Sequence, residues 1–405
     1  MKTFIRQSYL NRGTILDLKN KIKNSINKLE TYLDTTDLKG YDPYDALNSK
    51  LLSRLSFNNK LLKIIYTQAL KKLPINLRPL LLIKKDYNPK GLGLFLTGYL
   101  KLYSLDRNEK YFQKINRIIS ILEEVKSNGY SGYCWGYNFD WQSKANFAPR
   151  GTPTLVNTAF IAHAFLDAYE LLGKERFLRI ARSSADFILN DLHISKANSF
   201  ICFSYTPFDK SNVHNANMLG AGLLARLYSI TGEDKLLEFA GKAVGYVVSR
   251  QRSDGSWYYA ESNYQRWIDC HHTGFVLEGL FNYIKFGGDK SLLSNLNKGL
   301  VFLKNHFFLK NGMTKFYHDR DYPVDIHCPA QSIVTLVRLK DVQDNSPLLK
   351  KVVCWMIDNM QDPRGYFYYR KGRLFYNKIP YMRWAQAWAF HALTSYYSYL
   401  QNNGT

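Results

Sequence analysis

The chain has 405 residues, and 46% of them are hydrophobic, which is enough apolar content to bury a large core. Lysine and arginine outnumber aspartate and glutamate by 55 to 33, which gives a net charge of +22. Such a charge attracts nucleic acid, anionic lipid or an acidic substrate, although a Lys-, Asn- and Ile-rich composition is an alternative source of it. No helix-turn-helix, zinc-finger or RNA-recognition signature accompanies the charge, so we expect no nucleic acid partner.

The spacing of the cysteines and the lengths of the apolar runs indicate in which cellular compartment the protein is found. The five cysteines are widely spread and form no CxxC pair, a pattern that indicates a reducing compartment rather than a disulfide framework. The first residues, MKTFIRQSYLNRG, lack an apolar signal core. The longest apolar runs, such as LRPLLLI, are far shorter than the roughly 20 residues of a membrane span. We predict a cytoplasmic protein without a transmembrane segment, with peripheral contact to a membrane left open.

Residues 1–55 are charged and irregular apart from one amphipathic helix near 17–33, with its apolar residues on one side. The following stretch, DTTDLKGYDPYD, has the Gly and Pro content of a loop. We predict an N-terminal arm, 1–55, packed on a main domain of residues 56–405.

Two kinds of helix alternate along the main domain. One kind is apolar on nearly every side, which is typical of an interior helix, and the other has a single apolar stripe. The all-apolar helices are expected to start near 97, 158, 217, 271, 328 and 383. A repeat of about 57 residues over six units indicates a repeat architecture in which each unit packs on its neighbours. Six such pairs can close into a ring.

The links between helices differ in length. Short glycine-containing turns lead from an inner helix to an outer one, whereas long links lead from an outer helix to the next inner one. The long links are 127–153, 193–214, 252–269, 308–327 and 362–382. Several of them carry β-hairpin patterns, and long loops in a compact domain usually carry function. We therefore predict an all-α fold, an (α/α)6 toroid with small β-hairpins in the long loops at one end.

Polar and aromatic residues gather just before and at the start of each inner helix. Backbone N–H groups and helix dipoles also converge at that end, which favours an anionic ligand. We predict that the substrate-binding residues at this mouth are Trp135, Tyr137, Trp141, Arg150, His214, Asn215, Asn217, His271, His327, Gln331 and Arg383.

Four further residues near the mouth are candidates for catalysis: Asp140, Asp269, His272 and Asp325. Cleavage of a glycosidic bond uses one protonated carboxyl as acid and one ionised carboxylate as base or nucleophile. Each aspartate is also suited to capping a turn or a helix, and His272 to an ordinary hydrogen bond.

A second chemistry fits the same mouth. His272 or a tyrosine would remove the C5 proton of a uronate, and Arg150 or Arg383 would bind the carboxylate in the bidentate geometry that arginine allows. The two reactions differ in outcome, because a uronate enzyme exchanges solvent deuterium at C5 and a hydrolase releases a reducing end.

A zinc site is the third alternative. Cys270, His271, His272, His327 and Cys328 come from neighbouring repeats and have suitable ligand types. The Cys270-His271 pair resembles that of lanthionine-cyclase-like zinc toroids, but His272 stands where those proteins have glycine. Buried cysteine is more often a small hydrophobe. We expect no metal and no cofactor.

Residues 249–260, SRQRSDGSWYYA, resemble the Gln-Trp motif of triterpene cyclase and prenyltransferase toroids through Gln251, Gly255 and Trp257. Residues 359–369, NMQDPRGYFYY, are a degraded copy. In that family the motif ties helix ends together. The Asp-x-Asp-Asp acid motif of the cyclases is absent, so the resemblance does not imply cyclisation of a polyprene.

The alternating layout over about 58–400 is similar to the six-hairpin (α/α)6 glycosidases and to the helical domain of glucuronyl C5-epimerases. CPAQSIVTLVRL, residues 328–339, resembles the Gln-rich start of an inner helix in the latter. This resemblance is one of architecture, and no catalytic motif of either family is present here. It implies a toroid fold and a carbohydrate substrate.

We predict a carbohydrate-active enzyme that acts on an acidic glycan in bacterial polysaccharide biosynthesis or processing. The reaction would be glycoside hydrolysis, or C5 epimerisation or elimination of a uronate. The alternatives are a non-catalytic glycan-binding scaffold and a zinc-dependent, lanthionine-cyclase-like enzyme.

Overall fold

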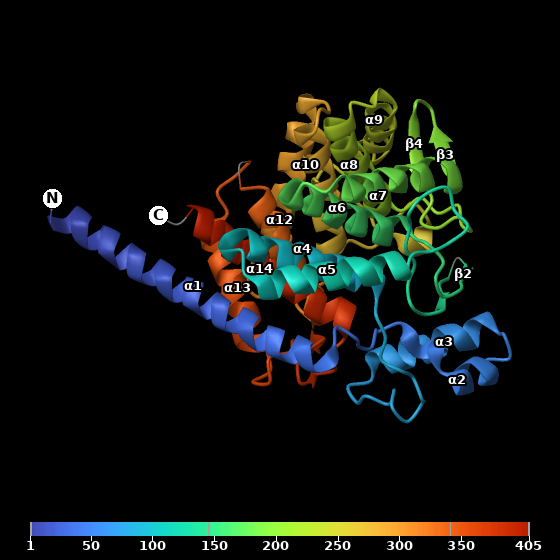
Figure 1. Cartoon of the computed structure of the whole chain (residues 1–405), viewed down its shortest axis with the longest axis horizontal. Coiled ribbons are helices and arrows are strands. Elements are labelled where there is room, and N and C mark those ends of the chain that lie inside the picture. Colours follow the sequence, from blue (N-terminus) through green and yellow to red (C-terminus); the bar gives the residue numbers. More distant parts are fainter. Residues whose placement is uncertain (1, 145, 341, 404–405) are drawn as a thin grey trace.

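Six apolar helices form the inner ring of the structure, a computed structural model that describes residues 2–144, 146–340 and 342–403 (Figure 1). They are α4 (Pro89–Asp106), α6 (Leu155–Leu172), α8 (His214–Thr231), α10 (Cys270–Lys285), α12 (His327–Arg338) and α14 (Trp388–Asn403), the last preceded by the π-helical turn η5 (Met382–Ala387). Each helix packs on the next, and α14 packs on α4. The ring is therefore closed, and the predicted (α/α)6 toroid is confirmed.

Five outer helices follow the inner ones along the chain. They are α5 (Glu109–Glu124), α7 (Glu175–Asp186), α9 (Asp234–Val248), α11 (Leu293–Phe307) and α13 (Ser346–Met360). Each has one apolar stripe, and the residues of that stripe are buried against the inner ring. Gly173 and Gly232 end α6 and α8 in the left-handed conformation, which lets the chain reverse within a few residues.

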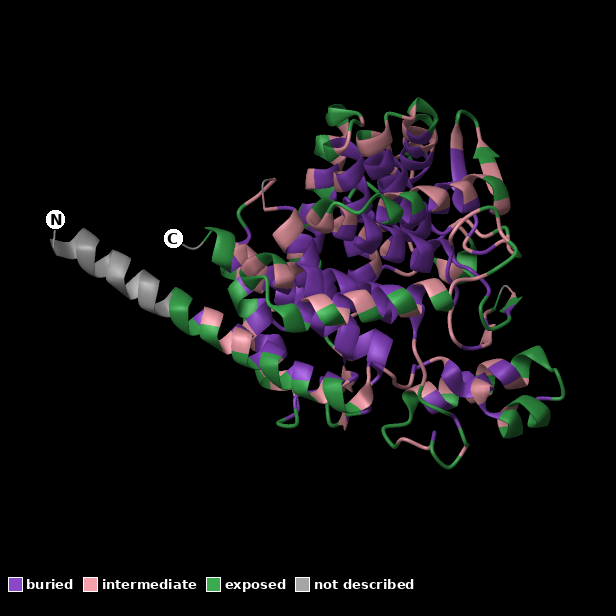
Figure 2. Cartoon of the chain, in the orientation of Figure 1, coloured by how far each residue is buried: buried purple, intermediate pink, exposed green. Residues whose placement is uncertain are grey.

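The sixth outer position belongs to α1 (Lys2–Thr36), which packs on α13 and α14. Ile22, Ile26, Leu29 and Leu33 have no exposed surface, and Figure 2 shows purple patches alternating with exposed ones along this helix. The segment predicted as an arm packed on the main domain thus contributes its first helix, α1, to the outer ring. The boundary predicted at residue 55 does not coincide with the start of the ring, because the first helix of the chain fills the place after the last one.

A repeated glutamine contact supports this position of α1. Gln251, after α9, donates its side-chain N–H to the backbone oxygen of Asn295 in α11 at 3.0 Å. Gln361, after α13, donates in the same way to the backbone oxygen of Ser25 in α1 at 3.0 Å. The two stretches that resemble the Gln-Trp motif thus join α9 to α11 and α13 to α1.

Replacing Gly365 with alanine should weaken the packing of α1. The backbone of Gly365 has a φ of +99°, and an added Cβ would lie 2.0 Å from the Lys28 backbone oxygen in α1. Gly129 has a similar φ of +86° but no atom near its Cβ position, so Gly129→Ala is a matched control. We expect Gly365→Ala to lower the free energy of unfolding by about 1–3 kcal/mol more than Gly129→Ala, measured by chemical denaturation. Equal losses would contradict this packing.

Short strands lie in the long links at one end of the toroid. β1 (Trp141–Gln142) pairs with β2 (Phe147–Ala148), and β3 (Ile194–Ala197) pairs with β4 (Phe200–Phe203), both antiparallel. A three-stranded sheet has the order β5 (Val324–Asp325), β6 (Arg370–Lys371) and β7 (Tyr376–Asn377). The short helical turns are η1 (Asp45–Asn48), η2 (Phe187–Asp191), η3 (Asn263–Gln265) and η4 (Lys290–Leu292).

Two further helices, α2 (Lys50–Leu55) and α3 (Lys60–Lys72), lie outside both rings and project beside the strand-bearing end (Figure 1). Asn59 caps α3 by accepting the backbone N–H groups of Leu61 and Leu62. None of the described helices combines the length and the apolar content needed to cross a membrane.

Candidate active site

A cavity of about 560 Å³ opens at the end of the toroid where the inner helices begin. Its volume lies within the range of small-ligand sites, roughly 300–1,000 Å³. Eleven of the 29 described residues that line it are tyrosine, phenylalanine or tryptophan, whose faces suit the apolar faces of a sugar ring. The aromatic residues of the wall include Tyr44, Tyr137, Phe139, Trp141, Tyr205, Tyr259, Trp267, Phe275, Tyr317 and Trp384.

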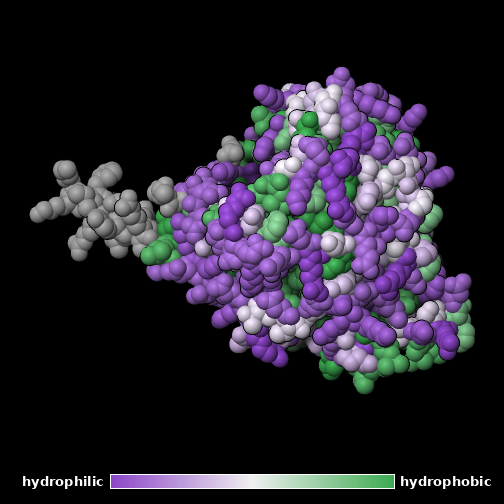
Figure 3. Space-filling model, in the orientation of Figure 1, coloured by the Kyte–Doolittle hydropathy of each residue, from purple (hydrophilic) through white to green (hydrophobic). Residues whose placement is uncertain are grey.

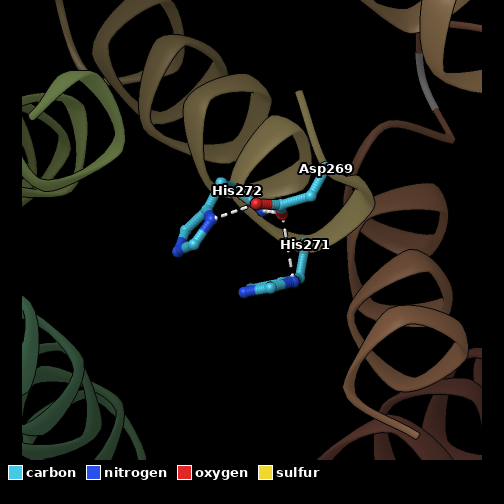
Figure 4. Close-up of side chains that lie close together, drawn as sticks. All are labelled: Asp269, His271 and His272. Carbon is cyan, nitrogen blue, oxygen red and sulfur yellow. Dashed lines mark hydrogen bonds and ion pairs between the residues drawn. The ribbon is translucent and has the colours of Figure 1, made fainter. Parts of the chain in front are cut away.

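Asp269 is the centre of a hydrogen-bonded cluster at the start of α10 (Figure 4). Its Oδ1 accepts the backbone N–H of His272 at 3.0 Å, so the aspartate caps the helix as the sequence suggested. Its Oδ2 accepts the Trp267 indole N–H at 2.8 Å and contacts Nδ1 of His272 at 2.6 Å. Nδ1 of His271 lies 3.1 Å from Oδ1.

The carboxylate of Asp269 accepts hydrogen bonds on both oxygens although the residue is only 1% exposed. Burial by itself raises the pKa of Asp269, but the two imidazoles and the hydrogen bonds outweigh burial and lower that pKa below its usual range. The carboxylate therefore stays ionised, which does not suit the protonated acid of a hydrolase. It is placed instead to fix the orientation and tautomer of His272.

His272 presents its free side to the cavity. With Nδ1 directed at the carboxylate, the Nε2 atom points away from Asp269 (Figure 4), and the side chain is 23% exposed on the cavity wall. The ring of Tyr259 lies 4.6 Å away, centroid to centroid. An imidazole held in this way has an Nε2 lone pair available to accept a proton from a bound molecule.

Two more histidine rings line the same wall. His271 and His327 stack with centroids 4.4 Å apart. Burial lowers the pKa of both imidazoles well below the usual value, and for His327 the charges of Lys90 and Arg383 lower it further. Both ring nitrogens of His327 are buried without a hydrogen-bond partner in the described part of the chain. Such atoms are usually satisfied in proteins, so a bound ligand is a natural partner for them.

Lys90, near the start of α4, is a cavity residue that the sequence reasoning did not find. It is 3% exposed, and its ammonium lies over the rings of Phe160, Phe275 and Trp388 at 4.4, 5.1 and 5.5 Å. No described residue forms a hydrogen bond or ion pair with it. Burial lowers the pKa of Lys90 well below its usual value. The signal that could have found it is a lysine in the first turn of a helix whose first half is otherwise apolar except for Thr97.

Arg383 also reaches the cavity, but its charge is neutralised. Both of its guanidinium contacts with Asp42 are short, 2.6 and 2.8 Å, and both side chains are buried. The predicted role of Arg383 as a free carboxylate binder does not fit this geometry. Lys90, by contrast, is a buried cavity cation, and no acidic side chain among the described residues pairs with it.

Removing Asp42 should be costly, because it would leave Arg383 buried without a counter-charge. We expect Asp42→Asn to lower the free energy of unfolding by about 3–5 kcal/mol, measured by chemical denaturation. The exposed Asp319→Asn, which breaks only a surface contact with Arg320, is the control. Similar losses in the two variants would contradict the importance of the buried pair.

The structure brings seven of the predicted residues onto the cavity wall. They are Tyr137, Trp141, Asn215, His271, His272, His327 and Arg383, with Asp269 directly behind the histidines. Seven others lie outside the lining, and each has a structural contact that explains its position. They are Trp135, Asp140, Arg150, His214, Asn217, Asp325 and Gln331.

The other two predicted carboxylates are engaged elsewhere. Asp140 accepts the backbone N–H of Arg150 at 2.7 Å, and Arg150 itself is exposed and paired with Asp86. Asp325 is buried and accepts hydrogen bonds from the side chains of Arg370 and Trp384, both at 2.7 Å. The three aspartates proposed as catalytic candidates therefore do not form an acid–base pair on the cavity wall, because each carboxylate serves local structure.

The remaining four residues hold the fold together. The indole of Trp135 is fully buried and donates to the backbone oxygen of Leu122 at 2.7 Å. Asn217 bonds three backbone groups, including the Phe203 N–H. His214 contacts Glu261 at 2.7 Å. Gln331 donates to Glu278 and Thr335.

The possible metal ligands differ from the predicted cysteine-containing set. Asp269, His271 and His272 have ligand atoms within 4.8 Å of one another among the described residues, and the cysteines do not join them. The 2.6 Å contact of His272 with Asp269 is a direct hydrogen bond, whereas two ligands of one tetrahedral zinc would lie about 3.3 Å apart. Burial also raises the pKa of the Cys328 thiol well above its usual value, which opposes thiolate formation. The residues fit a hydrogen-bonded histidine cluster better than a zinc site.

Comparison with known families identifies the chain. Residues 46–298, more than half of the sequence, match the family described as beta-L-arabinofuranosidase, GH127 catalytic domain. The chain belongs to this GH127 family. The matched region contains Lys90 and the Asp269 cluster, whereas His327 and Arg383 lie beyond its end. This GH127 chain is thus a carbohydrate-active enzyme of the six-hairpin glycosidase type. A search of curated proteins gives no match.

Solved structures support the fold of this GH127 chain. An unsaturated glucuronyl hydrolase specific for heparin is 14% identical, with a TM-score of 0.63 over 96% of this chain and 98% of that one. A cellobiose 2-epimerase from Bacillus thermoamylovorans is 13% identical, with a TM-score of 0.62 over 78% and 88% of the two chains. A GH76 alpha-mannanase of Bacteroides thetaiotaomicron is 15% identical, with a TM-score of 0.59 over 76% and 86%. At these identities the likeness concerns the fold alone.

Proposed function

We propose that this protein hydrolyses a glycosidic bond in an acidic glycan, with His272 as the general base. The observation that carries the proposal is the Asp269–His272 pair on the wall of an aromatic cavity in a GH127 chain. A role in bacterial polysaccharide biosynthesis or processing, inside the reducing cytoplasm, remains our prediction.

The geometry suggests how the base would act. Asp269 accepts the Nδ1–H of His272, so the Nε2 lone pair faces the cavity and can take a proton from water as the water attacks the anomeric carbon. The glycosidic C–O bond breaks as the new bond forms, and the leaving oxygen takes a proton from solvent water. The hydroxide that this leaves is neutralised by the proton that His272 then releases. Burial raises the pKa of Tyr259, so its hydroxyl stays protonated and can donate a hydrogen bond to the leaving oxygen.

Lys90 supports an acidic substrate. A buried ammonium without a carboxylate partner is unfavourable, and an anionic group of the substrate would compensate it. The helix dipole of α4 acts in the same direction, because Lys90 lies in the first turn of that helix.

Removal of the C5 proton of a uronate, which leads to epimerisation or elimination, is the second candidate reaction. The observation that favours it is the lack of a free carboxylate pair on the described wall of the cavity, where three histidines are found instead. A uronate with its carboxylate on Lys90 would place C5 in the same cavity as His272.

One assay separates these reactions. The purified chain is incubated in D2O with uronate-containing oligosaccharides and with p-nitrophenyl β-L-arabinofuranoside, and reducing ends and deuterium incorporation are both measured. Hydrolysis predicts reducing ends, and the second candidate predicts deuterium at C5. Neither product, together with measurable sugar binding, would indicate the non-catalytic scaffold and contradict both reactions.

A further inference from the structure

We infer that the face of the protein formed by α2, α3 and the loop after α3 binds the surface of an anionic lipid bilayer. Large apolar side chains project into solvent there to an unusual extent. Phe57, Leu80 and Leu82 are 81%, 80% and 82% exposed. Leu51, Leu55, Leu61, Ile65, Leu73 and Ile75 are exposed as well. Figure 3 shows apolar surface gathered at the edge where these helices project.

The charges on this face all have one sign. From residue 46 to residue 85 the chain contains lysines and arginines but no aspartate or glutamate. Lys50, Arg54, Lys60, Lys72 and Lys84 are exposed among the apolar side chains. Exposed apolar side chains surrounded by lysine and arginine are typical of a segment that binds at a membrane interface. The apolar groups enter the headgroup region, and the cations contact anionic lipid. A protein partner is less favoured, because the cores of such interfaces are depleted in lysine.

A second loop extends the same face. The β6–β7 hairpin carries Leu374 and Phe375, which are 92% and 61% exposed, beside the exposed Arg373. The side chain of Asn377 donates to the backbone oxygen of Leu73 at 2.9 Å, so the hairpin lies against the end of α3. Two segments about 300 residues apart in sequence thus present the same combination of apolar and basic groups side by side.

The proposed lipid-binding face lies next to the cavity, because α3 contributes side chains to both. Ile64, Thr67 and Gln68 of α3 line the cavity, whereas Leu61 and Ile65 of the same helix are exposed. Bilayer binding through α3 would hold the cavity mouth close to the lipid surface. A glycan carried on a lipid would then reach the site directly.

Vesicle flotation tests the inference on the full chain. Vesicles of phosphatidylcholine alone are compared with vesicles of phosphatidylcholine and phosphatidylglycerol in equal parts. We expect binding to the anionic vesicles only, weakened by salt, and weakened at least about tenfold by Leu80→Ser with Leu82→Ser or by Lys84→Glu with Lys85→Glu. The control is Lys174→Glu with Lys235→Glu, the same charge change at exposed positions near the short turns, and it should bind like the wild type.

Three results would overturn the inference. The first is the absence of wild-type binding to anionic vesicles, and the second is an equal loss in the control variant. The third is a wild-type dimer in solution that Leu80→Ser with Leu82→Ser converts to monomer, which would assign the face to a second copy of the chain. Because the readout is lipid binding, failure of the proposed reaction would leave the result unaffected. The substituted side chains are exposed, so thermal unfolding should remain unchanged.

Discussion

Replacing His272 with alanine is expected to lower kcat/KM about 10²- to 10⁴-fold on any glycan that the wild type converts. The reason is that His272 has its Nδ1 held by Asp269 and its Nε2 free on the cavity wall, and loss of a positioned general base has an effect of this size. The assay is initial-rate kinetics with the substrate found in the oligosaccharide screen. The loss is expected in kcat more than in KM, because the imidazole acts mainly in the transition state.

Two variants make this result specific. Asp269→Asn keeps the size of the side chain but no longer fixes the imidazole tautomer, so kcat should fall while His272 remains present. His306→Ala, on the exposed side of α11, removes a histidine outside the cavity and should leave the rate unchanged. Full activity of His272→Ala would remove both the hydrolytic and the C5 proposals, since the same base serves both.

Replacing Lys90 with methionine is expected to abolish any preference for acidic over neutral sugars. The loss of one buried charge-assisted contact costs about 2–4 kcal/mol, or roughly 30- to 1,000-fold in affinity for the acidic ligand. Isothermal titration calorimetry with galacturonate and galactose measures this difference directly. Affinity for galactose should change little, because only the charged group contacts the ammonium.

The same substitution should not destabilise the fold. Lys90 lies among aromatic rings without an acidic partner in the described chain, so a methionine of similar length removes an unfavourable buried charge. We expect an unchanged or increased free energy of unfolding together with the loss of acidic-sugar binding. Lys144→Met, at the exposed rim of the cavity, is the control. A wild type that binds both sugars equally would exclude Lys90 as an anion subsite.

The candidate site could be predicted only in outline. The periodic pattern predicted the starts of five inner helices to within a few residues, whereas α4 begins at Pro89 rather than near 97. Polar residues at the predicted starts were expected to share one mouth. Asp269 and His272 were found in this way, and so was Arg383. The separate roles of these residues could not be predicted. An aspartate before a helix has the same sequence signature whether it caps the helix, orients a histidine or donates a proton. Lys90 was missed because the first inner helix was expected to start near 97, which left residue 90 outside the predicted mouth.

The amino-acid sequence by itself determined the toroid, because helical periodicity and turn chemistry are local properties and six copies of them reinforce one another. Only the tertiary structure decided that α1 fills the sixth outer position, since contacts between the two ends of a chain leave no local pattern. It also decided which polar side chains line the cavity. That choice depends on which donors and acceptors find partners across neighbouring helices, as Arg383 does with Asp42 and as Lys90 does not.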